Sequence, residues 1–202
     1  MIFDNINNNR LVVARKAAEI IMEEGITDYL FAKRKAAKSL GLLSKDNLPS
    51  NQEIDKALKE YQNIFQDNID LEIIMKIKKE ALNIMTLFKE FNPHLTGQLL
   101  EGLIPKFPKI QINLFTDNLK EVEYILLNQN ISFDLKNTNY QEKLSKKQSI
   151  KVIPAFIIDG LWFPIELKVY FENDIRNKKN NILTNKGMNL KTIEKFQFNT
   201  IT

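Results

Sequence analysis

The sequence predicts an α+β fold, with a helical N-terminal region followed by a small mixed β-sheet. In the first ninety or so residues, apolar side chains recur every three or four positions, which is typical of helices. After Asn92-Pro93 the apolar spacing changes to every second residue, which is typical of strands. Asp159-Gly160 then separates two apolar runs, as in a β-hairpin. We therefore expect two regions, residues 1–91 and residues 92–202.

Composition limits the kinds of site that the chain can hold. Its 202 residues, 44% of them hydrophobic, are enough to form a buried core. The absence of cysteine and the single histidine exclude disulfides and zinc sites of the usual kind. The net charge of +4 comes from 29 basic and 25 acidic side chains, so the surface is mixed and is weak evidence for nucleic acid. No signal peptide and no apolar run of about 20 residues is present, so we expect a cytoplasmic protein without a membrane partner.

Four helices are expected in the N-terminal region. The first two run through residues 10–43 and are interrupted at Gly25. Ser50, with Glu53 three residues later, forms a capping box that opens the third helix. The fourth helix follows residues 67–70, and its apolar stripe is expected to face the sheet: Leu71, Ile74, Ile77, Ala81, Leu82, Met85 and Phe88.

The second of these helices carries a group of basic residues, Lys33, Arg34, Lys35 and Lys38. Residues 32–42 resemble the first half of a helix-turn-helix, and such a basic face is suited to a phosphate backbone. Lysine and arginine are also good helix formers, and no helix rich in base-reading side chains follows in register. A solvated helix face is the favoured interpretation, and nucleic-acid binding stays open as an alternative.

A strand with one polar face is expected at residues 109–115. Ile110, Ile112 and Leu114 alternate there with Gln111 and Asn113. A helix over residues 119–126, capped by Asp117, is expected next, and a strand at 131–135 then completes a βαβ-like unit. The elements expected after that unit are strands at 150–158 and 161–171, a loop at 172–186 and a short helix at 190–196.

The stretch from Leu95 to Leu114 resembles the signature of minimal nucleotidyltransferases. In that family a strand ends at a Gly-Ser pair, a short helix with a second glycine follows, and an Asp-x-Asp strand comes roughly ten residues later. Gly97 and Gly102 match the two glycines, and Gln98 replaces the serine. Lys109 and Gln111 occupy the positions of the two aspartates. The resemblance covers residues 92–171 and implies a nucleotidyltransferase-like topology.

The substitutions imply that the metal site of the family is lost. Alternate carboxylates on a strand point the same way and share magnesium ions, whereas a lysine repels them and a glutamine offers only an amide oxygen. Glu166 is the only candidate for a retained catalytic acid, and we expect an ion pair between Lys109 and Glu166 in place of a metal. Gly97, Gln98 and Gly102 are the candidates for cradling phosphates.

The resemblance implies a catalytically degenerate nucleotidyltransferase homologue that binds a nucleotide or has a scaffolding or regulatory role, without a cofactor. An active enzyme is the alternative. It would transfer a nucleoside monophosphate from a triphosphate to a hydroxyl on protein, RNA or a small molecule, using magnesium, Glu166, and a carboxylate such as Glu101 or Asp117 in place of the missing pair. The expected partners are a nucleotide, a nucleic acid or a protein.

A third interpretation rests on Glu166-x-Lys168 following Asp159, which is typical of PD-D/E-x-K nucleases. Asp159 is expected in a hairpin turn only seven residues before Glu166, and a Glu-x-Lys pair on a half-exposed strand often arises by chance. The nuclease is therefore the least favoured of the four functions considered.

Overall fold

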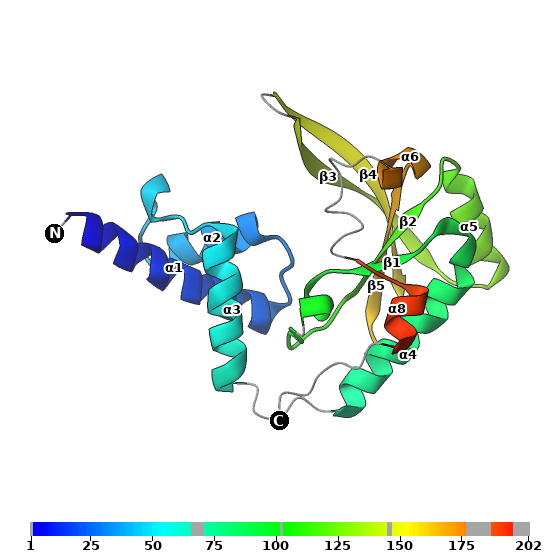
Figure 1. The fold of residues 1–202 in the computed structure, drawn as a ribbon, viewed down its shortest axis with the longest axis horizontal. Coiled ribbons are helices and arrows are strands. Elements are labelled where there is room, and N and C mark those ends of the chain that lie inside the picture. The colour runs from blue at the N-terminus through cyan, green and yellow to red at the C-terminus, as the bar shows by residue number, and fades with distance from the viewer. Residues whose placement is uncertain (1, 66–70, 102, 145–146, 177–186, 196–202) are drawn as a thin grey trace. The chain divides into compact units, whose positions relative to one another are not determined.

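The chain combines helices with a mixed sheet, as predicted. The computed structural model describes residues 2–65, 71–101, 103–144, 147–176 and 187–195 (Figure 1). They form two compact units, Met1–Asp70 with Glu101–Pro108, and Leu71–Leu100 with Lys109–Thr202. This division differs from the expected boundary between residues 91 and 92, because helix α4 (Leu71–Leu87) packs on the sheet strands β1 and β2.

The helical unit contains α1 (Ile2–Glu24), α2 (Tyr29–Ser39), the 3-10 turn η1 (Lys45–Asn47) and α3 (Asn51–Phe65). Its core is rich in alanine and aliphatic side chains, among them Ala14, Ala17, Ile21, Ala36, Ile54 and Leu58. The small alanines allow the three α-helices to pack closely.

The local signals for these helices are confirmed. The break between α1 and α2 falls at Gly25, whose φ of +67° suits glycine. The Ser50 amide donates to Glu53 Oε2 at 2.6 Å, and the Glu53 amide donates to Ser50 Oγ at 3.2 Å. This reciprocal pair is the capping box at the start of α3.

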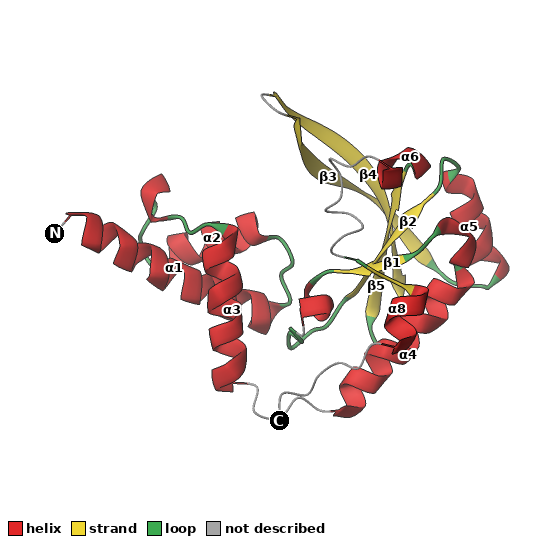
Figure 2. Cartoon of the chain, viewed as in Figure 1, coloured by secondary structure: helices red, strands yellow, loops and turns green. Residues whose placement is uncertain are grey.

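The second unit is built on a mixed sheet in the strand order β3-β4-β5-β2-β1-β6 (Figure 2). The strands are β1 (His94–Thr96), β2 (Ile110–Phe115), β3 (Phe133–Leu144), β4 (Lys147–Asp159), β5 (Pro164–Tyr170) and β6 (Met188–Asn189). The unit also contains η2 (Lys89–Phe91), η3 (Gln98–Glu101), α5 (Leu119–Asn128), α6 (Glu172–Arg176) and α8 (Leu190–Lys195). Strands β2 and β5 are parallel, and the other neighbours are antiparallel.

The strand pairing corrects the expected βαβ unit. Strand β3 does not return beside β2, because it continues to Leu144 and pairs along its whole length with β4. Strand β4 meets β5 only through its last five residues, Ala155–Asp159, so the far end of the β3–β4 hairpin extends away from the rest of the sheet (Figure 1). The parallel partner of β2 is β5.

The connection from β4 to β5 also differs from the expected turn. Asp159 is the last residue of β4, opposite Pro164, and four residues from Gly160 to Phe163 form the loop. Gly160 is not among the residues with positive φ, so the loop is not the tight hairpin that Asp159-Gly160 suggested.

Two smaller expectations need correction. The cap of α5 is Asn118, whose side chain accepts from the Lys120 amide at 3.2 Å, while Asp117 accepts from the Glu172 amide at 3.1 Å. The predicted loop at 172–186 begins as helix α6, and residues 177–186 lie outside the described part of the chain. The short terminal helix is present as α8.

The sheet has one apolar and one polar face. Ile110, Ile112 and Leu114 of β2 lie on the apolar face, as predicted, together with Ile165 and Leu167 of β5. Most of the predicted stripe of α4 is buried: Ile74, Ile77, Ala81, Met85 and Phe88. All six residues of β2 are buried, so its polar face is shielded from solvent as well. Within the described residues, no helix has the length and apolar character needed to cross a membrane.

Candidate functional site

A buried amide–carboxylate pair lies at the centre of the polar face. Gln111 of β2 and Glu166 of β5 are direct partners in the parallel register. Gln111 Nε2 donates to Glu166 Oε2 at 2.7 Å. The two residues are only 8% and 6% exposed, so this hydrogen bond lies in a region of low dielectric constant and fixes both side chains.

Two lysines approach the same carboxylate oxygen. Lys109 Nζ lies 4.0 Å from Glu166 Oε2, and Lys168 Nζ lies 3.8 Å from it. Both distances are those of ion pairs and are too long for direct hydrogen bonds. The lysine side chains are 33% and 27% exposed against 8% for Glu166, so the cationic groups lie closer to solvent than the carboxylate.

Gly97 completes the cluster from the end of β1. Thr96 is the register partner of Gln111, and Gly97 follows it with a φ of +89°. A Cβ atom on Gly97 would lie 2.3 Å from Gln111 Oε1. Glycine is therefore required at position 97 both for its backbone conformation and for the space that Gln111 occupies.

Most of the residues singled out by the resemblance are brought together. Gly97, Lys109, Gln111 and Glu166 lie in one cluster, and the expected ion pair between Lys109 and Glu166 is present. Gln98 follows at the start of η3, and Gly102 lies outside the described residues. The position of Lys168 in this cluster was not expected, since the sequence pattern connected it only with a nuclease. Its spacing of two residues from Glu166 on a strand was the available signal.

Among the described residues, the other carboxylates considered do not form a metal site with Glu166. In the part of the chain that is described, no group of three or more histidine, cysteine, aspartate or glutamate residues is placed to hold a metal ion. Asp117 is exposed and accepts the Glu172 amide, and the Glu101 side chain lies outside the described set. Asp159 lies in strand β4, so its placement in a turn was wrong. Strand alternation puts it on the face of Glu166, two register positions away.

The basic residues of α2 are used in part within the helical unit. Lys33 Nζ donates to Pro49 O at 2.8 Å and to Asn51 Oδ1 at 3.1 Å. Burial lowers the pKa of Lys33, although nearby carboxylates oppose the shift. Lys35 pairs with Glu24 on the surface, and Arg34 and Lys38 are also exposed. Two of the four basic residues of the expected patch therefore have partners within the helical unit.

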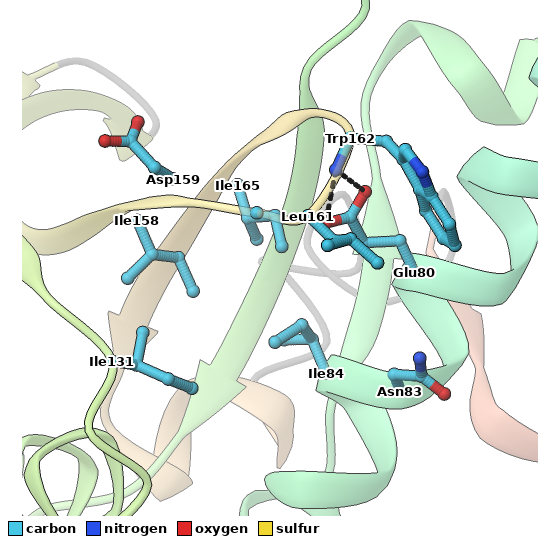
Figure 3. Close-up of a pocket in the computed structure, with 10 residues that line it drawn as sticks. Glu80, Asn83, Ile84, Ile131, Ile158, Asp159, Leu161, Trp162 and Ile165 are labelled. Atoms are coloured by element: carbon cyan, nitrogen blue, oxygen red, sulfur yellow. Dashed lines mark hydrogen bonds between the residues drawn. The ribbon is translucent and has the colours of Figure 1, made fainter.

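A pocket lies on the opposite, apolar face of the sheet, beneath the loop from Gly160 to Phe163 (Figure 3). Its volume is about 200 Å³, and its lining is mainly aliphatic, with Ile84, Ile131, Ile158 and Ile165. Figure 3 shows the Asp159 carboxylate pointing away from these side chains. The pocket is thus separate from the Glu166 cluster.

A second buried carboxylate, Glu80 of α4, closes this loop. Glu80 is 4% exposed, and its Oε2 accepts the backbone amide of Trp162 at 3.2 Å (Figure 3). The same oxygen accepts the Phe163 amide at 3.1 Å. A Cβ atom on Gly160 would lie 2.2 Å from Glu80 Oε1. The helical pattern gave no sign of this role, because a glutamate beside an apolar stripe is normally solvated.

The Glu166 cluster is the arrangement of side chains on which a function can be based. Comparisons with protein-family models, curated proteins and solved structures find no match to this chain. A function for this chain is therefore inferred from the chemistry of the Glu166 cluster and from the residue pattern around it.

Proposed function

We propose that the protein binds the phosphate groups of a nucleotide at the cluster of Gly97, Lys109, Gln111 and Glu166, without transferring the nucleotide. The observation that carries the proposal is the convergence of Gln111, Lys109 and Lys168 on one oxygen of Glu166. A nucleotidyltransferase-like sheet order is part of the same proposal. The features of that family on which the proposal relies are a strand that ends at Gly97 and an acid on a later strand, Glu166.

The charges favour phosphate binding over metal-assisted transfer. Two-metal transfer needs several carboxylates to hold the cations. Glu166 has an amide and two ammonium groups beside it instead, so a divalent cation would meet two positive charges at the position where it should bind. The same ammonium groups attract phosphate oxygens.

Gly97 supports this proposal from the backbone. Its positive φ and missing Cβ leave the polypeptide close to the Gln111 side chain. The space beside Gly97 thus holds Gln111, whose hydrogen bond to Glu166 keeps the carboxylate in place beside the two lysines.

Binding is tested by calorimetry and thermal shift with each of the four nucleoside triphosphates, with magnesium and with a chelator. A ligand that binds only the folded protein raises its melting temperature, and binding at 100 times Kd stabilises by about 2.7 kcal/mol. We expect at least one triphosphate to bind, and we expect no transfer of labelled nucleotide to protein or RNA.

Two results would point to a different function. Magnesium-dependent nucleotide transfer that Glu166→Ala abolishes would show an active nucleotidyltransferase. Metal-dependent cleavage of nucleic acid that Lys168→Ala abolishes would show a nuclease. The absence of binding to any triphosphate would contradict the proposal itself and leave a scaffolding role.

A further inference from the structure

We infer that Lys109 and Lys168 bind a polyphosphate chain directly and that no divalent cation takes part. This inference rests on the proposed phosphate-binding function and names the chemistry of its ligand. The Nζ atoms of both lysines lie within 4.0 Å of the same atom, Glu166 Oε2. A single polyanion can therefore reach both ammonium groups at once.

The ion pairs leave binding capacity on both lysines. Each ammonium group has three N–H donors and no acceptor. At 4.0 and 3.8 Å, neither makes a direct hydrogen bond to Glu166 Oε2. Phosphate oxygens can accept hydrogen bonds from both ammonium groups, and Gln111 can keep its own hydrogen bond to the Glu166 carboxylate.

The charge of the cluster has the sign that suits an anion. The cluster has two ammonium ions within 4.0 Å of one carboxylate, an excess of one positive charge, and the Asp159 carboxylate lies farther along the same face. Burial of Glu166 and partial exposure of both lysines place that excess on the solvent side. A polyphosphate is attracted by both ammonium groups, whereas a magnesium ion is repelled by both.

Glu166 is a positioning residue in this arrangement. Its carboxylate, fixed by Gln111, keeps two like charges side by side in the absence of ligand. Asn113 is the register partner of Lys168 and is 4% exposed, so the strand pair around the lysines is rigidly packed. Little side-chain entropy is then lost when the anion binds.

The experiment uses sodium tripolyphosphate as the probe in isothermal titration calorimetry, first in EDTA and then in magnesium. We expect binding in EDTA. Lys109→Met and Lys168→Met retain the apolar stems of the side chains and should each raise Kd about ten-fold through loss of a charge-assisted contact. The control is Lys120→Met on the exposed surface of α5, which should leave Kd unchanged. Circular dichroism and thermal melts establish that all variants are folded.

The outcomes separate this inference from the proposed function. Binding of tripolyphosphate or nucleotide only with magnesium would overturn the inference and leave nucleotide binding in place. Metal-free tripolyphosphate binding that both lysine variants weaken, without binding of any nucleotide, would support the inference and overturn the proposed function. Metal-free binding that neither variant changes would also overturn the inference, and an absence of all binding would overturn both.

Discussion

Two buried glutamates lie on opposite faces of the sheet and differ in what surrounds them. Glu80, 4% exposed, accepts two neutral backbone amides and closes the loop before β5. Glu166, 6% exposed, has one amide donor and two ammonium groups near it. The first carboxylate is satisfied by the fold alone, whereas the second lies among charges that exceed its own.

The comparison shows that burial of an acid is not by itself a sign of function. A carboxylate whose partners are neutral backbone groups holds a loop in place. A carboxylate with an excess of partly exposed cations maintains a charged surface that a ligand can use. Substitutions at the two positions should therefore affect different properties of the protein.

The largest expected loss of stability is at Glu80. Glu80→Ala leaves the Trp162 and Phe163 amides without their acceptor and should lower the free energy of unfolding by about 3 kcal/mol. Glu80→Gln retains one carbonyl acceptor and should lose about half as much. Urea denaturation followed by circular dichroism measures both values.

The comparison predicts a specific control for these variants. Glu80→Gln should bind tripolyphosphate with the Kd of the unmodified protein, because the loop lies on the apolar face. A Kd changed by this variant at a temperature where it is fully folded would mean that the two carboxylates do not have separate roles.

The next effect is expected at Gly97. Gly97→Ala places a Cβ atom 2.3 Å from Gln111 Oε1 at a backbone φ of +89°, and should cost about 2 kcal/mol of stability. Gln111→Ala alone removes the hydrogen bond to Glu166, but in the double variant it also removes the clash, so the double variant should lose less stability than the sum of the two single losses. Additive losses in this double-mutant cycle would show that the two residues are not in contact.

Glu53 of the helical unit is a third carboxylate to compare with the two buried glutamates, and it is partly exposed. Burial alone would raise the pKa of Glu53, but hydrogen bonds from Ser50 and Arg10 outweigh it and hold the pKa below its usual value. The stability that Glu53 contributes is therefore present above the pKa of the unfolded chain and is lost as pH falls through the lower pKa of the folded state.

Two variants test this contribution. Ser50→Ala removes the acceptor for the Glu53 amide and should cost about 1 kcal/mol near neutral pH. In Glu53→Gln the fall in stability between neutral pH and about pH 3 should be smaller than in the unmodified protein. An unchanged acid dependence in urea denaturation would contradict the assigned hydrogen bonds.

The smallest effect is expected at the exposed basic residues of α2. Lys33 and Lys35 have partners within the helical unit, so α2 does not present four unpaired basic residues to a phosphate backbone. The double variant Arg34→Gln, Lys38→Gln should therefore leave binding to random DNA or RNA unchanged. Binding measured by fluorescence anisotropy over a range of salt concentrations gives the test. A steep salt dependence that this variant removes would favour nucleic-acid binding.

Local sequence signals predicted the elements well where one periodicity dominated. The break at Gly25, the capping box at Ser50 and the alternation of β2 were all correct, since each depends on neighbouring residues alone. The choice of Asp117 over Asn118 as a cap failed because both residues cap helices well and they are adjacent in the sequence.

Contacts between residues far apart in the sequence could not be predicted from such local signals. Residues 136–149 lack a clear apolar alternation, so the length of β3 and its pairing with β4 were missed. The meeting of Lys109, Gln111 and Glu166 followed from the resemblance, whereas Lys168 joined them only through the parallel register of β2 and β5. The role of Glu80 depends on a loop about eighty residues later in the chain, which periodicity cannot reveal.

The most direct test of the account is an NMR titration of isotopically labelled protein with tripolyphosphate in EDTA. We expect backbone amide shifts to change first at Gly97, Gln111 and Lys168, and to remain constant at Trp162 and Phe163. Shifts confined to residues 33–38 of α2, or spread evenly over surface lysines, would contradict a built anion site at Glu166.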